Sequence, residues 1–152
     1  MGSFERKDYD ELIWLATGGD CSYEHEYSKE WSSISESSLK IYLGEGLCRT
    51  VKFSPLGYYW SDFDKIAIDV YSNSKEPSSV SIRAFQGLES NSSHKSKNVT
   101  LYYGFNSVVI ALNELKQSIS DEAPKLFRLD ISFYSKIEPA IFYLDNVRLL
   151  KE

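Results

Sequence analysis

The chain has 152 residues and a formal net charge of −5 at pH 7, and its length suits one domain with a core of its own. An acidic chain is a poor partner for nucleic acid, because phosphate binding needs a basic face. No apolar run approaches the roughly 20 residues of a membrane span. We therefore expect one domain over residues 1–152, with neither nucleic acid nor membrane as its partner.

Alternating apolar residues predict a series of short strands, because a period of two buries one face of a strand. The first pair, Leu39–Leu43 and Cys48–Phe53, flanks a Gly-Glu-Gly turn and reads as a hairpin. The later strands are expected at residues 65–72, 79–86, 98–103, 107–112, 126–134 and 141–150. One helical turn is expected at 113–117. This succession predicts an all-β fold, a β-sandwich or jelly roll.

The sequence lacks the motifs of familiar catalytic sites. It has no Gly-x-Ser-x-Gly elbow, no phosphate-binding glycine loop and no His-Glu-x-x-His. The pairs Asp62/Asp64 and Glu24/Glu26 have the residue types that glycosidases use, but carboxylates spaced by two are more often solvated. We therefore expect a binding domain and not an enzyme, with a small catalytic domain as the alternative.

The two cysteines, Cys21 and Cys48, do not have the spacing of a metal site. They would form one disulfide if the protein is secreted, and buried or free thiols are the alternative.

Six short sequence motifs follow one another along the chain: Phe4-Glu5, Trp14, Ser38-Leu39-Lys40-Ile41, Trp60-Ser-Asp-Phe-Asp64, Gly104-Phe-Asn106 and Leu144-Asp-Asn-Val-Arg-Leu149. In this order they resemble the jelly-roll carbohydrate-binding modules, galactose-binding-domain-like in fold, that are attached to bacterial polysaccharide-degrading enzymes. The resemblance spans nearly the whole chain and is weakest over residues 15–35. It bears on the fold more than on the ligand, because the same sandwich hosts other binders.

The resemblance implies two antiparallel sheets, one of which has a concave, glycan-binding face. That sheet would contain residues 48–54, 79–86, 97–103 and 127–134. The implied function is a non-catalytic module that binds a plant or microbial polysaccharide and targets an attached glycoside hydrolase to it. The implied setting is secreted, with catalytic or surface domains linked in the parent chain. The alternative is a structural or protein-interaction β-sandwich of a larger secreted or surface protein.

Strand alternation identifies the side chains on that outer face. In the strand ending at Tyr134, the apolar set Leu129, Ile131 and Phe133 points inward, so Arg128 and Asp130 point outward. With two loop tyrosines, the predicted carbohydrate-binding residues are Lys52, Tyr58, Tyr59, Arg83, Phe85, Tyr102, Arg128, Asp130 and Tyr134. The aromatic rings would stack on the C–H groups of a sugar, and the planar charged groups would form hydrogen bonds with its hydroxyls. The alternative is a solvated face of cross-strand ion pairs.

The resemblance also implies a structural calcium ion, since such modules often hold one near their joined chain ends. Glu5 and Asp145 match the usual carboxylate positions, and calcium prefers oxygen ligands. The alternative is that Asp145 binds no metal and only forms a hydrogen bond with a turn or an ion pair with Arg148. Trp31 is expected either in the core or on a binding surface.

Overall fold

The computed structural model describes residues 13–15, 24–33, 37–44, 48–53, 58–59, 62–85, 95–115, 125–126, 128–136 and 140–151, with only the backbone described at 13–15, 24–26, 58–59 and 125–126. Its strands are β1 (Ile13–Leu15), β2 (Glu24–Ser28), β3 (Ser38–Leu43), β4 (Cys48–Phe53), β5 (Tyr58–Tyr59), β6 (Lys65–Ser72), β7 (Ser78–Phe85), β8 (Ser96–Leu101), β9 (Gly104–Ala111), β10 (Lys125–Leu126), β11 (Arg128–Tyr134) and β12 (Ala140–Leu150).

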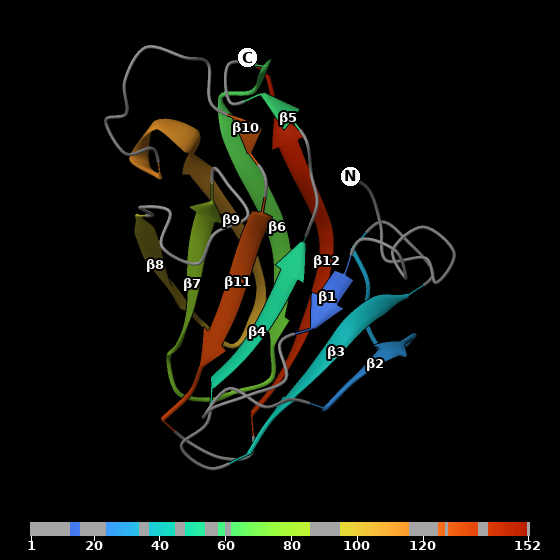
Figure 1. Cartoon of the computed structure of the whole chain (residues 1–152). Helices are drawn as coiled ribbons and strands as arrows, with labels where there is room; N and C mark the ends of the chain where they lie inside the picture. Colours follow the sequence, from blue (N-terminus) through green and yellow to red (C-terminus); the bar gives the residue numbers. More distant parts are fainter. Residues whose placement is uncertain are drawn as a thin grey trace.

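Ten of these strands form two antiparallel sheets that lie one behind the other (Figure 1). The first sheet has the order β1-β4-β11-β7-β8, and the second has the order β2-β3-β12-β6-β9. Strands β5 and β10 pair separately. The all-β sandwich is therefore confirmed, and so is the division of the eight main strands between the two sheets. The eight predicted strands did not include β1 and β2, which extend the two sheets.

The predicted hairpin of β3 and β4 is wrong. Strand β3 pairs with β2 and β12, whereas β4 pairs with β1 and β11, so the two strands belong to opposite sheets. Both bury their apolar sets in the same core from opposite sides, Ile41 from β3 and Phe53 from β4. A glycine-rich turn marks a reversal of the chain, but it does not distinguish a hairpin from a crossing between sheets.

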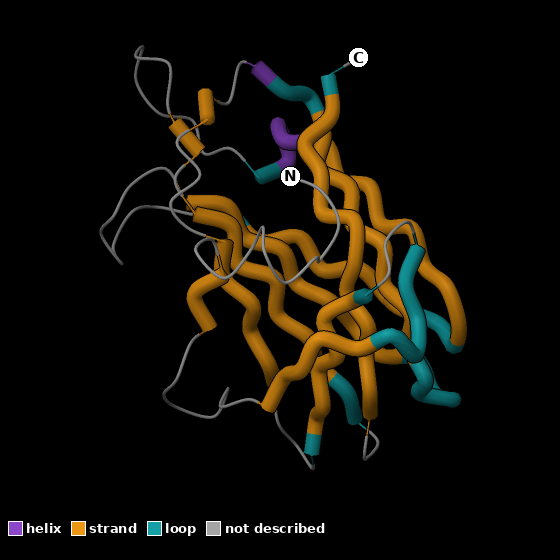
Figure 2. Tube along the Cα trace, turned by 90° about the vertical axis from the view of Figure 1, so that its right-hand side faces the viewer, coloured by secondary structure: helices purple, strands orange, loops and turns teal. Residues whose placement is uncertain are grey.

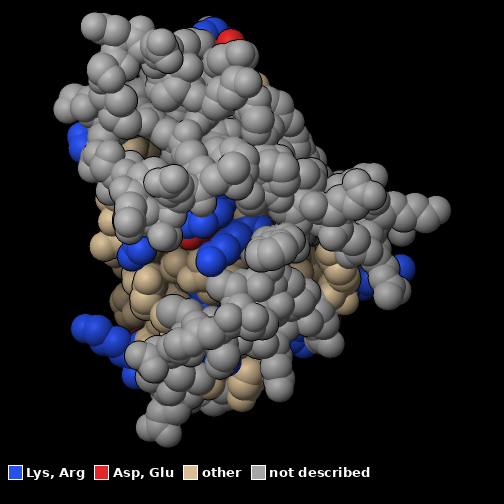
Figure 3. Space-filling model, in the orientation of Figure 1, with Lys and Arg blue, Asp and Glu red and all other residues tan. Residues whose placement is uncertain are grey.

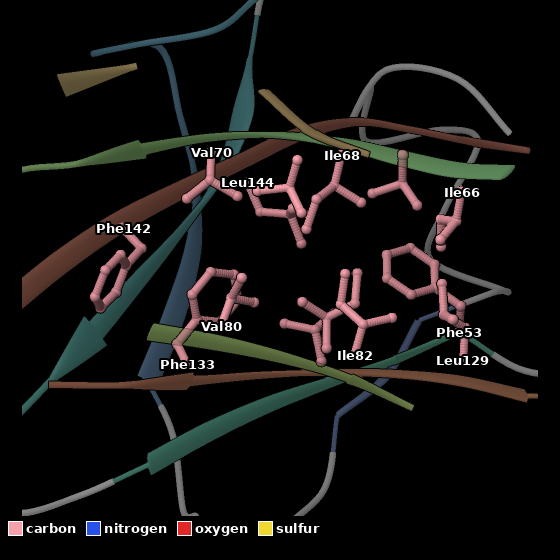
Figure 4. Close-up of a cluster of buried hydrophobic side chains, with 14 of the residues drawn as sticks. Phe53, Ile66, Ile68, Val70, Val80, Ile82, Leu129, Phe133, Phe142 and Leu144 are labelled. Carbon is pink, nitrogen blue, oxygen red and sulfur yellow. The ribbon is translucent and has the colours of Figure 1, made fainter. Parts of the chain in front are cut away.

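The core lies between the two sheets, where their inward side chains meet (Figure 4). Phe133 of β11 and Phe142 of β12 stack with ring centroids 5.1 Å apart, and neither is exposed to solvent. Ile68 and Ile82 fill the same layer from β6 and β7. One core thus supports the outer faces of both sheets.

Most of the described chain is strand, joined by loops and short helical segments (Figure 2). A 3-10 turn at Leu112–Glu114 overlaps the start of the helical turn expected at 113–117, of which residues 116–117 lie outside the described residues. It is anchored where the Leu112 N–H donates to the Asp64 carbonyl oxygen at 2.8 Å. None of the described helices has the length and hydropathy to cross a membrane.

Candidate functional site

The outer face of the first sheet, called here the first face, is built from side chains that lie opposite one another on four strands. Asp130 of β11 has Lys52 of β4 on one side and Arg83 of β7 on the other. Directly opposed residues of antiparallel strands project to the same side of the sheet. Because Leu129 and Ile131 point into the core, this row points away from it.

Three cationic side chains surround the carboxylate of Asp130. Arg128 Nε lies 2.9 Å from Asp130 Oδ1. The electrostatic influence of Lys52 and Arg83 also reaches this carboxylate. Asp130 is only 6 % exposed, so it carries its charge in a site from which most water is excluded. One anion is thus shared by three cations.

Burial nevertheless dominates the titration of Asp130. Loss of hydration raises the pKa of this carboxyl above its usual value, although Arg128, Lys52 and Arg83 all act to lower it. Arg128 Nε and Asp130 Oδ1 form a close ion pair at 2.9 Å, whereas Arg83 Nε is buried without a hydrogen-bond partner among the described residues. The cluster therefore retains unused hydrogen-bonding capacity.

Hydroxyl and amide side chains continue the first face beside the charged cluster. Ser132 lies opposite Thr50 and Ser81, and the Thr50 and Ser132 hydroxyl oxygens are hydrogen-bonded at 2.7 Å. Ser81 in turn lies opposite Asn98 of β8. This row of the first face is therefore polar from β4 to β8.

Two open depressions lie on this polar surface. One has a volume of about 380 Å³ and is lined by Ser79, Ser81, Arg83, Ser96, Asn98 and Tyr134. The other, of about 410 Å³, is lined by Pro77, Ser78, Ser79, Thr100, Tyr134, Ser135 and Lys136. They share Ser79 and Tyr134, so they lie end to end. On this side of the molecule, Lys and Arg atoms gather around a carboxylate (Figure 3).

Six of the nine predicted binding residues therefore lie on the first face. Lys52, Arg83, Arg128 and Asp130 form the charged cluster, Tyr134 lines both depressions, and Phe85 lies opposite Arg128. Their roles in binding stay predictions. All six were assigned to this face by the alternation of apolar residues in their strands.

The exposure predicted for Phe85 is wrong. Its ring is only 4 % exposed, and the Arg128 guanidinium carbon lies 3.8 Å from the ring centroid. Arg128 is its register partner on β11, so the arginine covers the ring in a cation–π contact. Alternation predicts the side of a sheet but not whether a neighbour covers the side chain there.

Tyr102 is exposed, as predicted, but the strand expected to carry it ends one residue earlier. Strand β8 ends at Leu101, and Tyr102 lies in the turn before β9 with 64 % of its surface exposed. The Tyr102 N–H donates to Asn106 Oδ1 at 3.0 Å, and Asn106 Nδ2 donates back to the Tyr102 carbonyl. Tyr102 lines neither depression. Strand alternation does not extend beyond the last paired residue.

Tyr58 and Tyr59 form strand β5, which pairs with Leu126 and Lys125 of β10. Their side chains lie outside the described residues, so their predicted contact with ligand stays a prediction.

The calcium site stays a prediction as well, because Glu5 lies outside the described residues. Asp145 is fully buried, and its Oδ2 accepts hydrogen bonds from the Ser33 N–H and hydroxyl at 2.8 and 3.1 Å. Its Oδ1 accepts from the Asn146 N–H at 2.7 Å. Arg148 pairs with Asp69 at 3.3 Å. In the described part of the chain, Asp145 acts as a hydrogen-bonding anchor, and no group of three metal-ligating side chains occurs there.

An aromatic cluster on the outer face of the second sheet was not predicted. Tyr143, Tyr71 and Phe105 are register partners across β12, β6 and β9. Phe105 and Tyr103 are exposed to 58 % and 63 %. The signal was present in the sequence, since Tyr71 alternates with the buried Ile68 and Val70 set on the opposite side of β6. We call Trp31, Tyr71, Tyr103, Phe105 and Tyr143 the aromatic face.

Trp31 belongs to this aromatic face and not to the core. Its ring centroid lies 5.6 Å from that of Tyr71 and 6.0 Å from that of Phe105. The loop that carries it is held by the Ser33–Asp145 hydrogen bonds. The Ser38 hydroxyl also donates to the Trp31 carbonyl. The open choice between core and surface is thus decided for surface.

Cys48, at the start of β4, is disulfide-bonded. Cys21 is the only other cysteine in the chain. This decides the question that cysteine spacing left open.

No family model and no curated protein sequence matches this chain. Solved structures do match its fold. The family 11 carbohydrate-binding module of Clostridium thermocellum, solved with a β-1,3-1,4-mixed-linked tetrasaccharide, aligns with a TM-score of 0.68 and 10% identity over 98% of this chain and 94% of its own. A carbohydrate-binding module specific for non-crystalline cellulose aligns with a TM-score of 0.66 and 14% identity over 94% and 91%.

An exo-β-agarase also aligns, with a TM-score of 0.69 and 12% identity over 100% of this chain but only 24% of the enzyme. At such low identity, the likeness concerns the fold. The chain therefore has the β-sandwich jelly-roll architecture seen in these carbohydrate-binding modules.

Proposed function

We propose that this chain is a non-catalytic module that binds a polysaccharide along the first face. The observation that carries the proposal is the pair of adjoining depressions on the first face, which are lined by Arg83, Tyr134 and hydroxyl side chains. The fold supports it, because the modules with which the chain aligns include complexes with oligosaccharides.

The first face offers the chemistry that sugar recognition needs. Arg83 presents a planar group that can bond two adjacent hydroxyls, and Ser79, Ser81 and Asn98 add neutral donors and acceptors. Tyr134 is the one aromatic side chain among the described residues that lines both depressions, so we assign it the stacking role. Phe85 instead positions Arg128 from below.

Affinity electrophoresis against soluble β-glucans, xylans, mannans and pectins tests the proposal. We expect retardation on at least one polymer, and we expect Tyr134→Ala to reduce it without a large fall in melting temperature. Tyr103→Ala is the matched control, because Tyr103 is an exposed tyrosine on the aromatic face. Absence of retardation on every polymer with a folded sample would contradict the function.

A second candidate, a protein-interaction β-sandwich, is favoured by the exposed rings of Tyr103 and Phe105 on the aromatic face. Exposed aromatic clusters often mark contact surfaces. This candidate predicts no signal from glycans, and it predicts that a neighbouring domain of the parent chain protects Phe105 from solvent, as measured by hydrogen exchange of β9.

We further propose that the module is secreted and linked to a catalytic or surface domain. The disulfide at Cys48 supports secretion, because disulfides persist in oxidising compartments. The alignment with about a quarter of an exo-β-agarase supports linkage to an enzyme. Sequencing of the surrounding gene and fractionation of the native host would test both.

A further inference from the structure

We infer that the glycan bound on the first face is anionic, carrying carboxylate or sulfate groups along its chain. The inference rests on the proposed function and specifies its ligand class. It starts from the charge of the first face, where Lys52, Arg83 and Arg128 surround the single carboxylate of Asp130. Among the described side chains of that cluster, three positive charges therefore meet one negative charge.

Asp130 does not compensate all three cations. Its close ion pair is with Arg128, at 2.9 Å, and Arg128 is in addition held over the Phe85 ring. Arg83 and Lys52 are left as the surplus charge. At the far end of the depressions, Lys136 adds a further cation. The groove therefore has positive charge at both ends and neutral hydroxyl groups between them.

Arg83 also retains hydrogen-bonding capacity. It lines one depression, and its Nε is buried with no hydrogen-bond acceptor among the described residues. A buried donor without a partner is destabilising. A carboxylate or sulfate oxygen is the strongest acceptor for a guanidinium group, and it binds in a planar, two-point geometry. The arginine is thus arranged for an anionic partner.

The local positive charge of the first face contrasts with the negative net charge of the whole protein. The protein has a formal net charge of −5, so its overall field repels a polyanion and does not attract it without a specific site. A positive cluster on an acidic protein therefore predicts a local, saturable site, and salt should weaken it because the cations are partly open to solvent.

The test uses titration calorimetry at pH 7 with two matched pairs of polymers. Polygalacturonate is compared with its fully methyl-esterified form, and ι-carrageenan is compared with its desulfated form. We expect at least one anionic polymer to bind about ten-fold tighter than its neutral counterpart. We expect that preference to shrink when NaCl is raised from about 20 mM to about 500 mM, because the electrostatic screening length then becomes about five-fold shorter. The arm that binds identifies carboxylate or sulfate as the source.

Arg83→Gln combined with Lys52→Gln removes the surplus charge and leaves the Arg128–Asp130 pair in place. We expect this double variant to lose the preference for the anionic polymer while keeping its melting temperature within a few degrees. Lys29→Gln is the matched control, because Lys29 is an exposed lysine that directly follows β2, a strand of the second sheet. It should bind as the unchanged protein does.

Equal binding of the charged and neutral polymers would overturn the inference while leaving the proposed function intact. Anionic binding that survives in the double variant would overturn it as well, because the charge would then act elsewhere. Absence of binding to all four polymers, and to the neutral glycans named above, would overturn both the inference and the function.

Discussion

The two outer faces of the sandwich have opposite chemistry although one core supports both. The first face is polar and positively charged, and its one Phe ring is covered by Arg128. The aromatic face instead leaves Phe105 and Tyr103 more than half exposed. Further along β6 and β12, the carboxylates of Asp69 and Asp145 are buried and accept hydrogen bonds.

Hydrogen bonding and ring stacking, the two means of sugar recognition, were both expected on the first face, but the structure places most of the exposed ring surface on the aromatic face. The first face can supply charge-assisted hydrogen bonds, whereas the aromatic face supplies ring surface. Among the described side chains, Tyr134 brings the one aromatic ring to the depressions. The described residues of the first face therefore offer hydrogen bonds and charge at more positions than they offer ring surface.

The largest expected effect is on stability, and it compares a phenylalanine of the shared core with one of the aromatic face. Phe133→Ala removes a ring that is fully buried and stacked on Phe142 across the sandwich. We expect it to lower the free energy of unfolding by about 3–5 kcal/mol, from lost burial and the cavity left behind. Phe105→Ala, the same change on the aromatic face, should cost only about 1 kcal/mol from the lost contact with Trp31. Urea denaturation measures both, and similar losses would mean that Phe133 is not in the core.

A smaller effect separates the faces in binding. Tyr134→Ala should weaken glycan affinity about ten-fold, which corresponds to about 1.4 kcal/mol, because Tyr134 lies at the junction of the two depressions. Tyr103→Ala should leave the affinity unchanged. Titration calorimetry with the best polymer of the screen measures this difference. The reverse result would move the site to the aromatic face.

The sequence predicted the sides of the strands well and the environment of individual side chains less well. Alternation correctly placed Leu129, Ile131 and Phe133 inward, because buried strands must face apolar groups to one layer. It could not predict that Arg128 covers Phe85, since that contact depends on the register between β11 and β7. Register is set by long-range pairing, which is not encoded in either strand alone.

Two further differences have the same kind of cause. The hairpin of β3 and β4 was inferred from a local turn, but the sheet in which a strand pairs is decided by the whole core. The aromatic face was missed because alternation was applied to the first sheet only. Applied to β6 and β9, it would have placed Tyr71 and Phe105 on one surface.

The smallest expected effect is a pair of opposite pH dependences, one from each face. Burial raises the pKa of Asp130 above its usual value, against the influence of Arg128 from β11, Lys52 from β4 and Arg83 from β7. The folded protein therefore binds a proton at Asp130 more readily than the unfolded chain does. From about pH 4, the ordinary range for Asp, the contribution of Asp130 to stability should fall as the pH rises through its raised pKa.

Glu30, beside the aromatic face, should behave in the opposite way. Hydrogen bonds from Lys40, at 2.8 Å, and from the Tyr143 hydroxyl lower the pKa of this carboxyl. Its contribution to stability is present above the pKa of the unfolded chain and is lost as the pH falls through the lowered pKa. Urea denaturation of Asp130→Asn and Glu30→Gln between pH 3 and 7, the range about the ordinary carboxyl pKa values, measures both contributions against the unchanged protein. Slopes of the same sign would show that Asp130 is stabilised by its three cations more than it is penalised by burial, and the first face would then carry less surplus charge than its geometry indicates.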